Sequence, residues 1–365
     1  MRKHHLSKKL FFAGVVLFII GAIGVAFTIK SGEMIEKGEP LTKQWELASG
    51  DISKIAFYSN HDTLIELKES TNGKNYIELK GNYSKEDKEA IEKLKPATEN
   101  GTAIDMTIPQ QNNWFNFVKI YAYGQQKLTI YLTKDTKVNN IEAKTSSGDL
   151  SVSNFEVNKL VVAANSGEVK INQIVAASAE ISTTSGDIEL SNTEANTALE
   201  TSSGGIDITH LTGDLEVNGN SGDVNASGVE SEKLKIALDS GEIELTNSLV
   251  ADLATLTTSS GDISANIKGE LRVESSSGGI ELEGVTNNLN AKTSSGDIDA
   301  SFIENVKTIQ IDTNSGEIEL KLPADYKGIF DANSNSGSVK VPTSDSNTDN
   351  RVTVKTSSGD IKIEK

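Results

Sequence analysis

The sequence has no cysteine among its 365 residues, only four histidines, and few aromatic residues, which make up 5% of the chain. The absence of cysteine excludes disulfides, thiolate metal sites, iron–sulfur clusters and thiol catalysis. Two of the histidines, His4 and His5, belong to a basic N-terminal segment. A histidine-dependent triad or a two-histidine metal site therefore has little to draw on. Because aromatic rings are scarce, stacked aliphatic side chains must form most of any core.

What the sequence has instead is one short motif written twelve times: Ser-Gly, one variable residue, and then Ile, Val or Leu. The copies are 17 to 22 residues apart. Repeats of this length are typical of solenoids, in which each repeat buries its apolar face only against stacked neighbours. The motif glycines are Gly148, Gly167, Gly186, Gly204, Gly222, Gly241, Gly261, Gly278, Gly296, Gly316, Gly337 and Gly359.

Apolar residues alternate with polar ones on both sides of each glycine, which we count as position 0. Positions +2 and +4 are aliphatic or alanine in every copy, position −5 is mostly aliphatic, position −3 is mostly small and position −1 is always serine. A period of two is typical of half-buried strands. We therefore predict an all-β, single-chain β-solenoid of about twelve two-strand coils over residues 141–365, with Ser and Gly at the corner. Apolar residues at position +7 are expected to fill the opposite bend: Phe155, Ile174, Leu211, Val229, Val285 and Ile303.

The N-terminus contains a run of twenty residues, Leu10 to Ile29, whose only polar member is Thr28. This length suits a transmembrane helix. Because four basic residues precede the run, the positive-inside rule predicts a cytoplasmic tail at 1–9, a helix at 10–29 and an extracytoplasmic remainder. A cleaved signal peptide is the alternative. Residues 30–42 are expected to be a polar tether.

Residues 43–140 lack the repeat, and we expect them to be an irregular, mostly-β region that caps the solenoid. Ser49-Gly50-Asp51-Ile52 resembles the motif but fails at positions −7 and +4, so we interpret it as degenerate or accidental. One helix is predicted over Lys85 to Lys95, with Ser84 as its N-cap and Pro96 after it. The far end has no comparable cap, and Lys355, Lys362 and Lys365 would guard an exposed edge there. The expected strands are Ile52–Tyr58, Thr63–Leu67, Tyr76–Lys80, Ala103–Ile108, Phe117–Tyr123 and Lys127–Leu132.

The charge of the chain is strongly negative and one-sided. All 52 acidic residues follow the apolar run, whereas four of the 35 basic residues precede it, so the rest of the chain carries about −21. Binding to nucleic acid is therefore disfavoured. In the eight coils from Gly186 to Gly316, the outward positions +1 and +3 hold twelve acids and no base. These acids are Asp187, Glu189, Asp207, Asp223, Glu242, Glu244, Asp262, Glu281, Asp297, Asp299, Glu317 and Glu319.

The row of acids has two interpretations. As a functional site, it would bind divalent cations, Ca²⁺ above all, or a basic partner, because Ca²⁺ prefers clustered carboxylate oxygens. As a structural feature, Asp after Gly is common turn chemistry, and outward acids keep a stackable sheet soluble. The spacing differs from that of known calcium-binding nonapeptide repeats. We therefore expect no cofactor and keep the twelve acids as candidate ligands of Ca²⁺.

Several passages resemble a known family. These are the order of basic tail, apolar span and β region, the passage from Lys127 to Asp149, the repeated Thr-Ser-Ser-Gly-Asp-Ile, and Lys321-Leu-Pro-Ala-Asp-Tyr326. The chain is similar here to the bacterial LiaG-like β-strand-repeat family, whose members are often labelled adhesins. The resemblance implies a surface-exposed, membrane-tethered protein of Gram-positive type associated with cell-envelope stress loci, with no catalytic or binding residues to carry over.

We therefore expect a non-enzymatic, membrane-anchored, extracytoplasmic β-solenoid that presents a surface to the cell envelope or to another protein. A calcium-stiffened spacer is the first alternative. A polysaccharide-active β-helix enzyme is the second, but an enzyme needs one cluster that breaks the repeat and holds a carboxylate with a shifted pKa. The acids of this sequence are instead regular.

Overall fold

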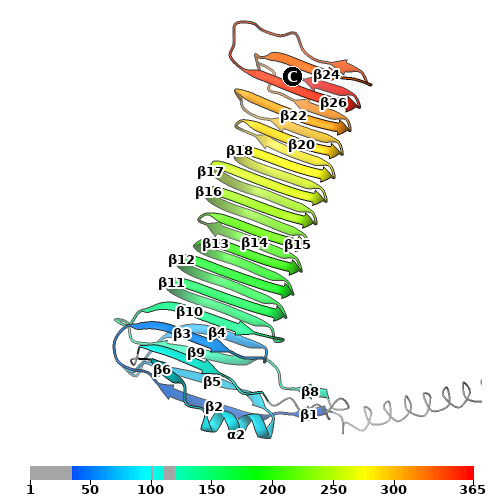
Figure 1. Cartoon of the computed structure of the whole chain (residues 1–365). Coiled ribbons are helices and arrows are strands. Elements are labelled where there is room, and N and C mark those ends of the chain that lie inside the picture. The colour runs from blue at the N-terminus through cyan, green and yellow to red at the C-terminus, as the bar shows by residue number, and fades with distance from the viewer. Residues whose placement is uncertain (1–34, 100–101, 111–119) are drawn as a thin grey trace, which may run out of the picture.

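The computed structural model describes residues 35–99, 102–110 and 120–365. They form a rod of stacked parallel strands that stands on a base of parallel and antiparallel strands and one helix (Figure 1). The all-β solenoid expected from the repeats is confirmed. No helix within the described ranges is long and apolar enough to cross a membrane. The predicted tail at 1–9 and span at 10–29 lie outside those ranges.

The base contains the strands that precede Val138 and the helix α2. Its elements are β1 (Ile35–Lys37), β2 (Glu39–Glu46), β3 (Ile52–Tyr58), β4 (Thr63–Glu69), β5 (Tyr76–Tyr83), α2 (Lys85–Lys93), β6 (Ala97–Glu99), β7 (Ala103–Thr107), β8 (Ile120–Ala122) and β9 (Gln126–Leu132). Five of the six strands predicted in this region are present with small shifts at their ends. Of the sixth, Phe117–Tyr123, residues 117–119 lie outside the described residues, and β8 covers Ile120–Ala122. β2 begins at Glu39, inside the segment expected to be a tether.

The rod consists of the remaining strands, which pair in parallel from coil to coil. They are β10 (Val138–Thr145), β11 (Leu150–Ser166), β12 (Val169–Ser185), β13 (Ile188–Ser203), β14 (Ile206–Thr212), β15 (Leu215–Ser221), β16 (Val224–Ser240), β17 (Ile243–Ser260), β18 (Ile263–Ser277), β19 (Ile280–Val285), β20 (Leu289–Ser295), β21 (Ile298–Phe302), β22 (Thr308–Ser315), β23 (Ile318–Lys321), β24 (Ile329–Ser334), β25 (Val339–Lys340), β26 (Arg351–Ser358) and β27 (Ile361–Glu364).

The inward positions of the repeat form the core, as predicted. Eleven of the twelve residues at position +2 are no more than 2% exposed. The exception is Val339, which is 42% exposed because its coil is the last of the stack. Five of the six residues expected to fill the opposite bend are buried, but Ile303 is 62% exposed. A register shift between β19 and β21 brings Phe302 opposite Val285 instead, and Phe302 is the buried residue.

The motif glycine is required because the coils approach each other closely at the corner. A Cβ on Gly261 would lie 2.0 Å from the carbonyl oxygen of Gly241, and the φ angle of Gly261 is +147°. Backbone hydrogen bonds continue around this corner: Gly261 donates to the Ser277 carbonyl at 3.1 Å, and Ile263 donates to the Gly279 carbonyl at 3.0 Å. Any side chain here would push two coils apart and break this ladder.

A second bend lies six residues after the motif glycine, at position +6. Five non-glycine residues there have positive φ angles between 49° and 63°: Asn154, Gln173, Asn192, His210 and Asn247. Two other copies have glycine there, also with positive φ, at Gly228 and Gly284. Asparagine and glycine tolerate this left-handed conformation better than other residues. The sequence pattern indicated an opposite bend but not the residues that form it.

The last two coils are stacked in the reverse of their sequence order. The C-terminal strands β26 and β27 pair with β22 and β23 on one side, and with β24 and β25 on the other. The end of the chain therefore lies inside the stack, and the earlier strands β24 and β25 form the open end (Figure 1). The expectation that Lys355, Lys362 and Lys365 guard an exposed final edge is therefore wrong for Lys355 and Lys362. Lys355 pairs with Asp312 on one side and Asn333 on the other, and Lys362 Nζ lies 3.0 Å from a Glu319 carboxylate oxygen of the adjacent coil.

At the other end of the stack, in the base, strands are also stacked out of their sequence order. β3 and β4 lie directly beneath the first coil, because β3 pairs in parallel with β10 and β4 with β11. The later strands β7 and β9 lie beneath them, on β3 and β4 respectively. The region expected to be irregular thus holds two further solenoid layers. Antiparallel β5 and β6 then close the lower edge against β9 and β7.

Two local predictions in the base have clear outcomes. The helix is confirmed, since the Ser84 hydroxyl accepts a hydrogen bond from the Asp87 amide at 2.9 Å, and it ends at Lys93. Ser49-Gly50-Asp51-Ile52 is not a copy of the motif corner, because Ile52 pairs in register with Val138 of β10, before Gly148, and His61 lies beneath the glycine column instead. Asp51 accepts a hydrogen bond from the Lys137 amide at 3.0 Å and Ile52 donates to the Lys137 carbonyl at 2.8 Å, so the passage contacts the start of β10.

The reversed order of the last coils can be tested with paired cysteines, because the chain contains none of its own. Glu319 pairs in register with Lys362, and Lys362 with Lys340. A Glu319→Cys, Lys362→Cys variant should therefore be crosslinked by a short bis-thiol reagent, which mass spectrometry would detect. A Glu319→Cys, Lys340→Cys variant should give little product. The opposite result would mean that the coils stack in sequence order.

Candidate functional site

The twelve candidate acids lie on the outside of one sheet of the rod, which we call the acidic face. All are exposed except Glu319, which is half-buried. The sheet is formed by the strand segments that follow each motif glycine, and these pair in register from β11 to β23. The side chains at +1 and +3 therefore form two rows parallel to the rod axis.

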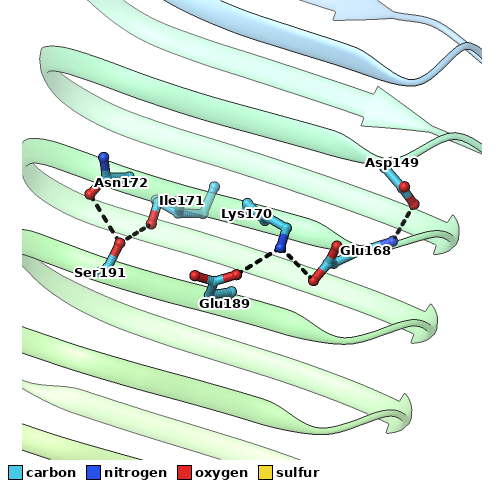
Figure 2. Close-up of polar contacts among 7 residues, drawn as sticks. All are labelled: Asp149, Glu168, Lys170, Ile171, Asn172, Glu189 and Ser191. Atoms are coloured by element: carbon cyan, nitrogen blue, oxygen red, sulfur yellow. Dashed lines mark hydrogen bonds and ion pairs between the residues drawn. The ribbon is translucent and has the colours of Figure 1, made fainter. Parts of the chain in front are cut away.

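The aspartates at position +1 bind backbone amides of the adjacent coil. In each case Oδ1 of the aspartate accepts a hydrogen bond from the amide at position +1 of the next coil. The pairs are Asp149 with Glu168 at 2.9 Å, Asp187 with Gly205 at 2.8 Å, Asp223 with Glu242 at 2.9 Å, Asp262 with Gly279 at 2.7 Å, Asp297 with Glu317 at 2.7 Å and Asp360 with Ser338 at 2.7 Å. Figure 2 shows the first pair.

These aspartates occupy every second coil in space. Counted up the rod, position +1 reads Asp149, Glu168, Asp187, Gly205, Asp223, Glu242, Asp262, Gly279, Asp297, Glu317, Asp360 and Ser338. In sequence order the alternation fails at the last two copies, because Ser338 precedes Asp360. The reversed stacking of these coils restores it. Each aspartate thus accepts a hydrogen bond from the amide at position +1 of the following coil. At most of these corners the backbone amides at positions 0 and +2 donate to backbone carbonyls instead.

The acids of the row at position +3 have a lysine at each end. Lys170 Nζ lies 2.9 Å from oxygens of both Glu168 and Glu189 (Figure 2), and these hydrogen bonds raise the lysine pKa. At the other end Lys362 bonds Glu319 and holds the pKa of that carboxyl below its usual value. Asn225 separates acids within the row and donates to Asp207 at 3.1 Å. Lysines and amides thus reduce the repulsion along the row.

Three acids of this row lie on consecutive coils without a neutral spacer: Glu281, Asp299 and Glu319. Desolvation by its neighbours raises the pKa of Asp299, although its side chain is exposed, and the charges of Glu319 and Asp297 add to that effect. Within the described residues, no three His, Asp or Glu side chains form a group suited to hold a metal ion. Ca²⁺ binding by the acidic face stays a prediction.

The hollows of the surface lie elsewhere. None of the twelve acids lines any of five hollows found on the described residues. Three of the five lie on the opposite sheet, formed by the segments that precede each motif glycine. Sequence reasoning missed them because each is built from small contributions of several coils, and only the register of the stack brings those residues together.

A buried polar cluster joins the base to the first coil. A Cβ on Gly148 would lie 2.5 Å from the carbonyl carbon of His61, so His61 occupies the corner directly beneath the glycine column. Its ring meets that of Tyr83 edge-on at 5.3 Å, and burial lowers the His61 pKa, although the charges of Asp87 and Asp62 oppose this. His61 Nε2, Tyr83 Oη and Gln126 Oε1 are buried without a hydrogen-bond partner among the described residues. Sequence analysis left His61 without a role.

We expect this joint to weaken in mild acid. A histidine with a lowered pKa in the folded state contributes stability above its unfolded value, about 6.5, and loses it as the pH falls toward the folded value. The protection factors of the base strands in the full chain, which are exchange rates corrected for the intrinsic pH dependence of amide exchange, should therefore fall between pH 7.5 and pH 5.5, and His61→Gln should flatten this dependence. His210→Asn is the control, since His210 is exposed. An equal pH slope in His61→Gln would contradict the prediction.

Two neighbouring acids should differ in their effect on stability. Asp297→Ala removes the bond to the Glu317 amide and should lower the unfolding free energy by about 1 kcal/mol, whereas Asp297→Asn keeps an acceptor and should restore most of it. Asp299→Asn should leave stability unchanged or raise it at pH 7, because its charged form is disfavoured in the fold. Denaturant unfolding measures both. Equal losses in Asp297→Ala and Asp299→Asn would contradict the different roles.

Comparisons with known proteins agree with the architecture. A search of the curated proteins finds no match. Solved structures of similar shape include two from Parabacteroides distasonis. A candidate lipid-binding protein has 17% identity over 77% of this chain and 98% of its own, with a TM-score of 0.33. A candidate adhesin has 13% identity over 78% of this chain and 99% of its own, with a TM-score of 0.37. A candidate adhesin from Parabacteroides merdae has 15% identity over 77% of this chain and 98% of its own, with a TM-score of 0.30. Likenesses at this level carry no argument about function.

The family comparison is more informative. The sequence matches the Toastrack DUF4097 family over residues 52–217, 212–270 and 267–364. The match begins at β3, the first strand of the layer beneath the motif coils, and ends within β27. The finer resemblance to LiaG-like proteins stays a prediction. Because the match spans most of the chain and follows the observed solenoid, the protein belongs to the Toastrack DUF4097 family.

Proposed function

We propose that the protein is a non-enzymatic, membrane-anchored, extracytoplasmic rod that presents its repeat surface to cell-envelope components or to another protein. The observation that carries this proposal is the equivalence of the coils. Outward side chains recur in rows along the rod, so the surface offers many similar contacts and no single distinguished centre. Such a surface suits extended or multivalent partners.

The titratable groups support a role without catalysis. Among the described carboxylates, only Asp299 has a resolved pKa above its usual value. Its neighbours Asp297 and Glu319 belong to the same repeating rows and not to a cluster that breaks the repeat. A glycosidase-like mechanism would need a raised carboxyl and a second carboxylate facing one cleft. Asp299 lines none of the five hollows.

The arrangement of the chain supports an anchored rod. The apolar run at 10–29 precedes the base in sequence, and the open end formed by β24 and β25 lies at the other end of the stack (Figure 1). Twelve motif coils at about 4.8 Å each give a reach of about 58 Å. The sheets would thus stand away from the bilayer, where envelope polymers and proteins are accessible.

The proposed topology can be tested with single cysteines in the otherwise cysteine-free chain. On intact cells, a membrane-impermeant thiol reagent should label Ser276→Cys, which lies on an exposed part of the rod. Ser7→Cys, in the predicted cytoplasmic tail, should be labelled only after the membrane is permeabilised. Labelling of Ser7→Cys on intact cells, or protection of Ser276→Cys, would contradict the proposal.

The presented surface can be tested with the same variants. A photoactivatable thiol reagent attached to Ser276→Cys or to Glu244→Cys samples opposite sheets of the rod. Illumination of intact cells should crosslink envelope material to at least one of them, as mass spectrometry or glycan staining would show. Failure of both positions to capture any envelope component would count against a presenting role.

A further inference from the structure

Two of the hollows on the sheet opposite the acidic face join into one long groove. One has a volume of about 390 Å³ and the other about 620 Å³, and they share Asn218 and Asn220 of β15. Together they run from β11 to β20, across eight successive coils. We call this the axial groove. At about 4.8 Å per coil, it extends about 34 Å along the rod.

The walls of the axial groove are two rows of outward side chains, at positions −4 and −2. The backbone and the inward residues of position −3 lie between these rows, and Gly219 is the smallest of those residues. A Cβ on Gly219 would lie 2.7 Å from Leu238 Cδ2, so glycine here makes room for the larger neighbour. The groove is thus open at the surface and continuous along the axis, which suits a chain and not a compact molecule.

The lining is rich in uncharged hydrogen-bonding groups. Amides and hydroxyls of the −2 row include Asn165, Thr184, Ser202, Asn220, Ser259 and Ser276. All six side chains are exposed, and none makes a hydrogen bond to another described residue. Amides and hydroxyls both donate and accept. They can therefore satisfy a partner that is itself covered with hydroxyl groups.

The charges of the groove disfavour an anionic partner. Three acids line it, Glu200, Asp239 and Glu274, against the single base Lys292. A polyphosphate or an acidic polysaccharide needs clustered Lys or Arg side chains. The parallel hollow at positions −8 and −6 has the opposite character, because charged residues such as Glu216, Lys233 and Lys235 form its walls. Of these two parallel hollows, the axial groove is the longer and the less charged.

The spacing of the rows favours a glycan over a peptide. The coils repeat at about 4.8 Å, whereas an extended peptide advances about 3.3 Å per residue and would lose register with the rows. An extended β-1,4-linked pyranose chain advances by close to one coil spacing per sugar. We infer that the axial groove binds a neutral, extended, β-linked polysaccharide, with sugars placed along successive coils. This inference rests on the proposed presenting function and names the class of partner.

The absence of aromatic residues from this lining has a consequence for affinity. Without ring stacking, each sugar would be held by hydrogen bonds that exchange with water and contribute little individually. Tight binding would then depend on many coils acting together on one chain. A longer glycan should therefore bind much more tightly than a short one, up to the length of the groove.

The test uses the full chain in detergent micelles and a soluble mixed-linkage β-glucan, together with tetrasaccharide and octasaccharide fragments of it. We expect the octasaccharide to bind at least ten-fold more tightly than the tetrasaccharide in surface plasmon resonance. Asn220→Ala combined with Ser259→Ala should weaken octasaccharide binding at least ten-fold. Both side chains are exposed and make no bond within the described protein, so the melting temperature should not change.

The matched control is Asn225→Ala, which removes an exposed amide from the same coil but on the acidic face. It should leave glucan binding unchanged, and α-linked dextran should bind weakly to every variant. The inference is overturned if octasaccharide and tetrasaccharide bind alike, if Asn225→Ala weakens binding as much as the double variant, or if a polyanion or an extended peptide binds more tightly. If the glucan-binding experiment fails but the crosslinking on intact cells succeeds, the inference about the axial groove is rejected and the proposed presenting function is retained.

Discussion

The close approach of successive coils at the glycine corner is the constraint on which the rest of the structure depends. The carbonyl of one motif glycine lies where the Cβ of the next would be, as at Gly241 and Gly261. This contact lets the parallel backbone ladder continue around the corner without a gap. Since every coil turns in the same way, every outward residue lies directly above its counterpart, and each position of the repeat becomes a row along the rod.

These rows explain both the polar network and the candidate binding surfaces. On one sheet the rows at +1 and +3 bring like charges onto adjacent coils, and the fold limits the repulsion with backbone amides, lysines and spacers. Asp262, for example, accepts the Gly279 amide at 2.7 Å. On the other sheet, rows of Ser, Thr and Asn leave a groove between them. The aspartates at position +1 therefore stabilise the contact between adjacent coils. The hollows lie on the other sheet, which the segments before each motif glycine form.

Much of the rod could be predicted from the sequence, but its ends could not. The period of two and the motif glycines determine the strands, the buried positions and the corner, because these depend only on a residue and its equivalents in adjacent coils. The stacking order at the ends depends on which of two pairs of strands, such as β24/β25 or β26/β27, pairs with the last edge of the rod. One signal existed: the alternation of Asp at +1 breaks at Ser338 and Asp360 in sequence order and is restored when β26 and β27 lie beneath β24 and β25.

By itself, then, the sequence determined a glycine-cornered, aliphatic-cored stack with acidic rows on one side, since local sterics and parity suffice for each of these. Only the tertiary structure decided that later strands lie beneath earlier ones at the base, that the C-terminus lies inside the stack, and that His61 occupies the corner under Gly148. It also decided where the surface is hollowed. The physical reason is that a groove of eight coils and a closed stack end arise from register between residues far apart in the chain, which no single repeat encodes.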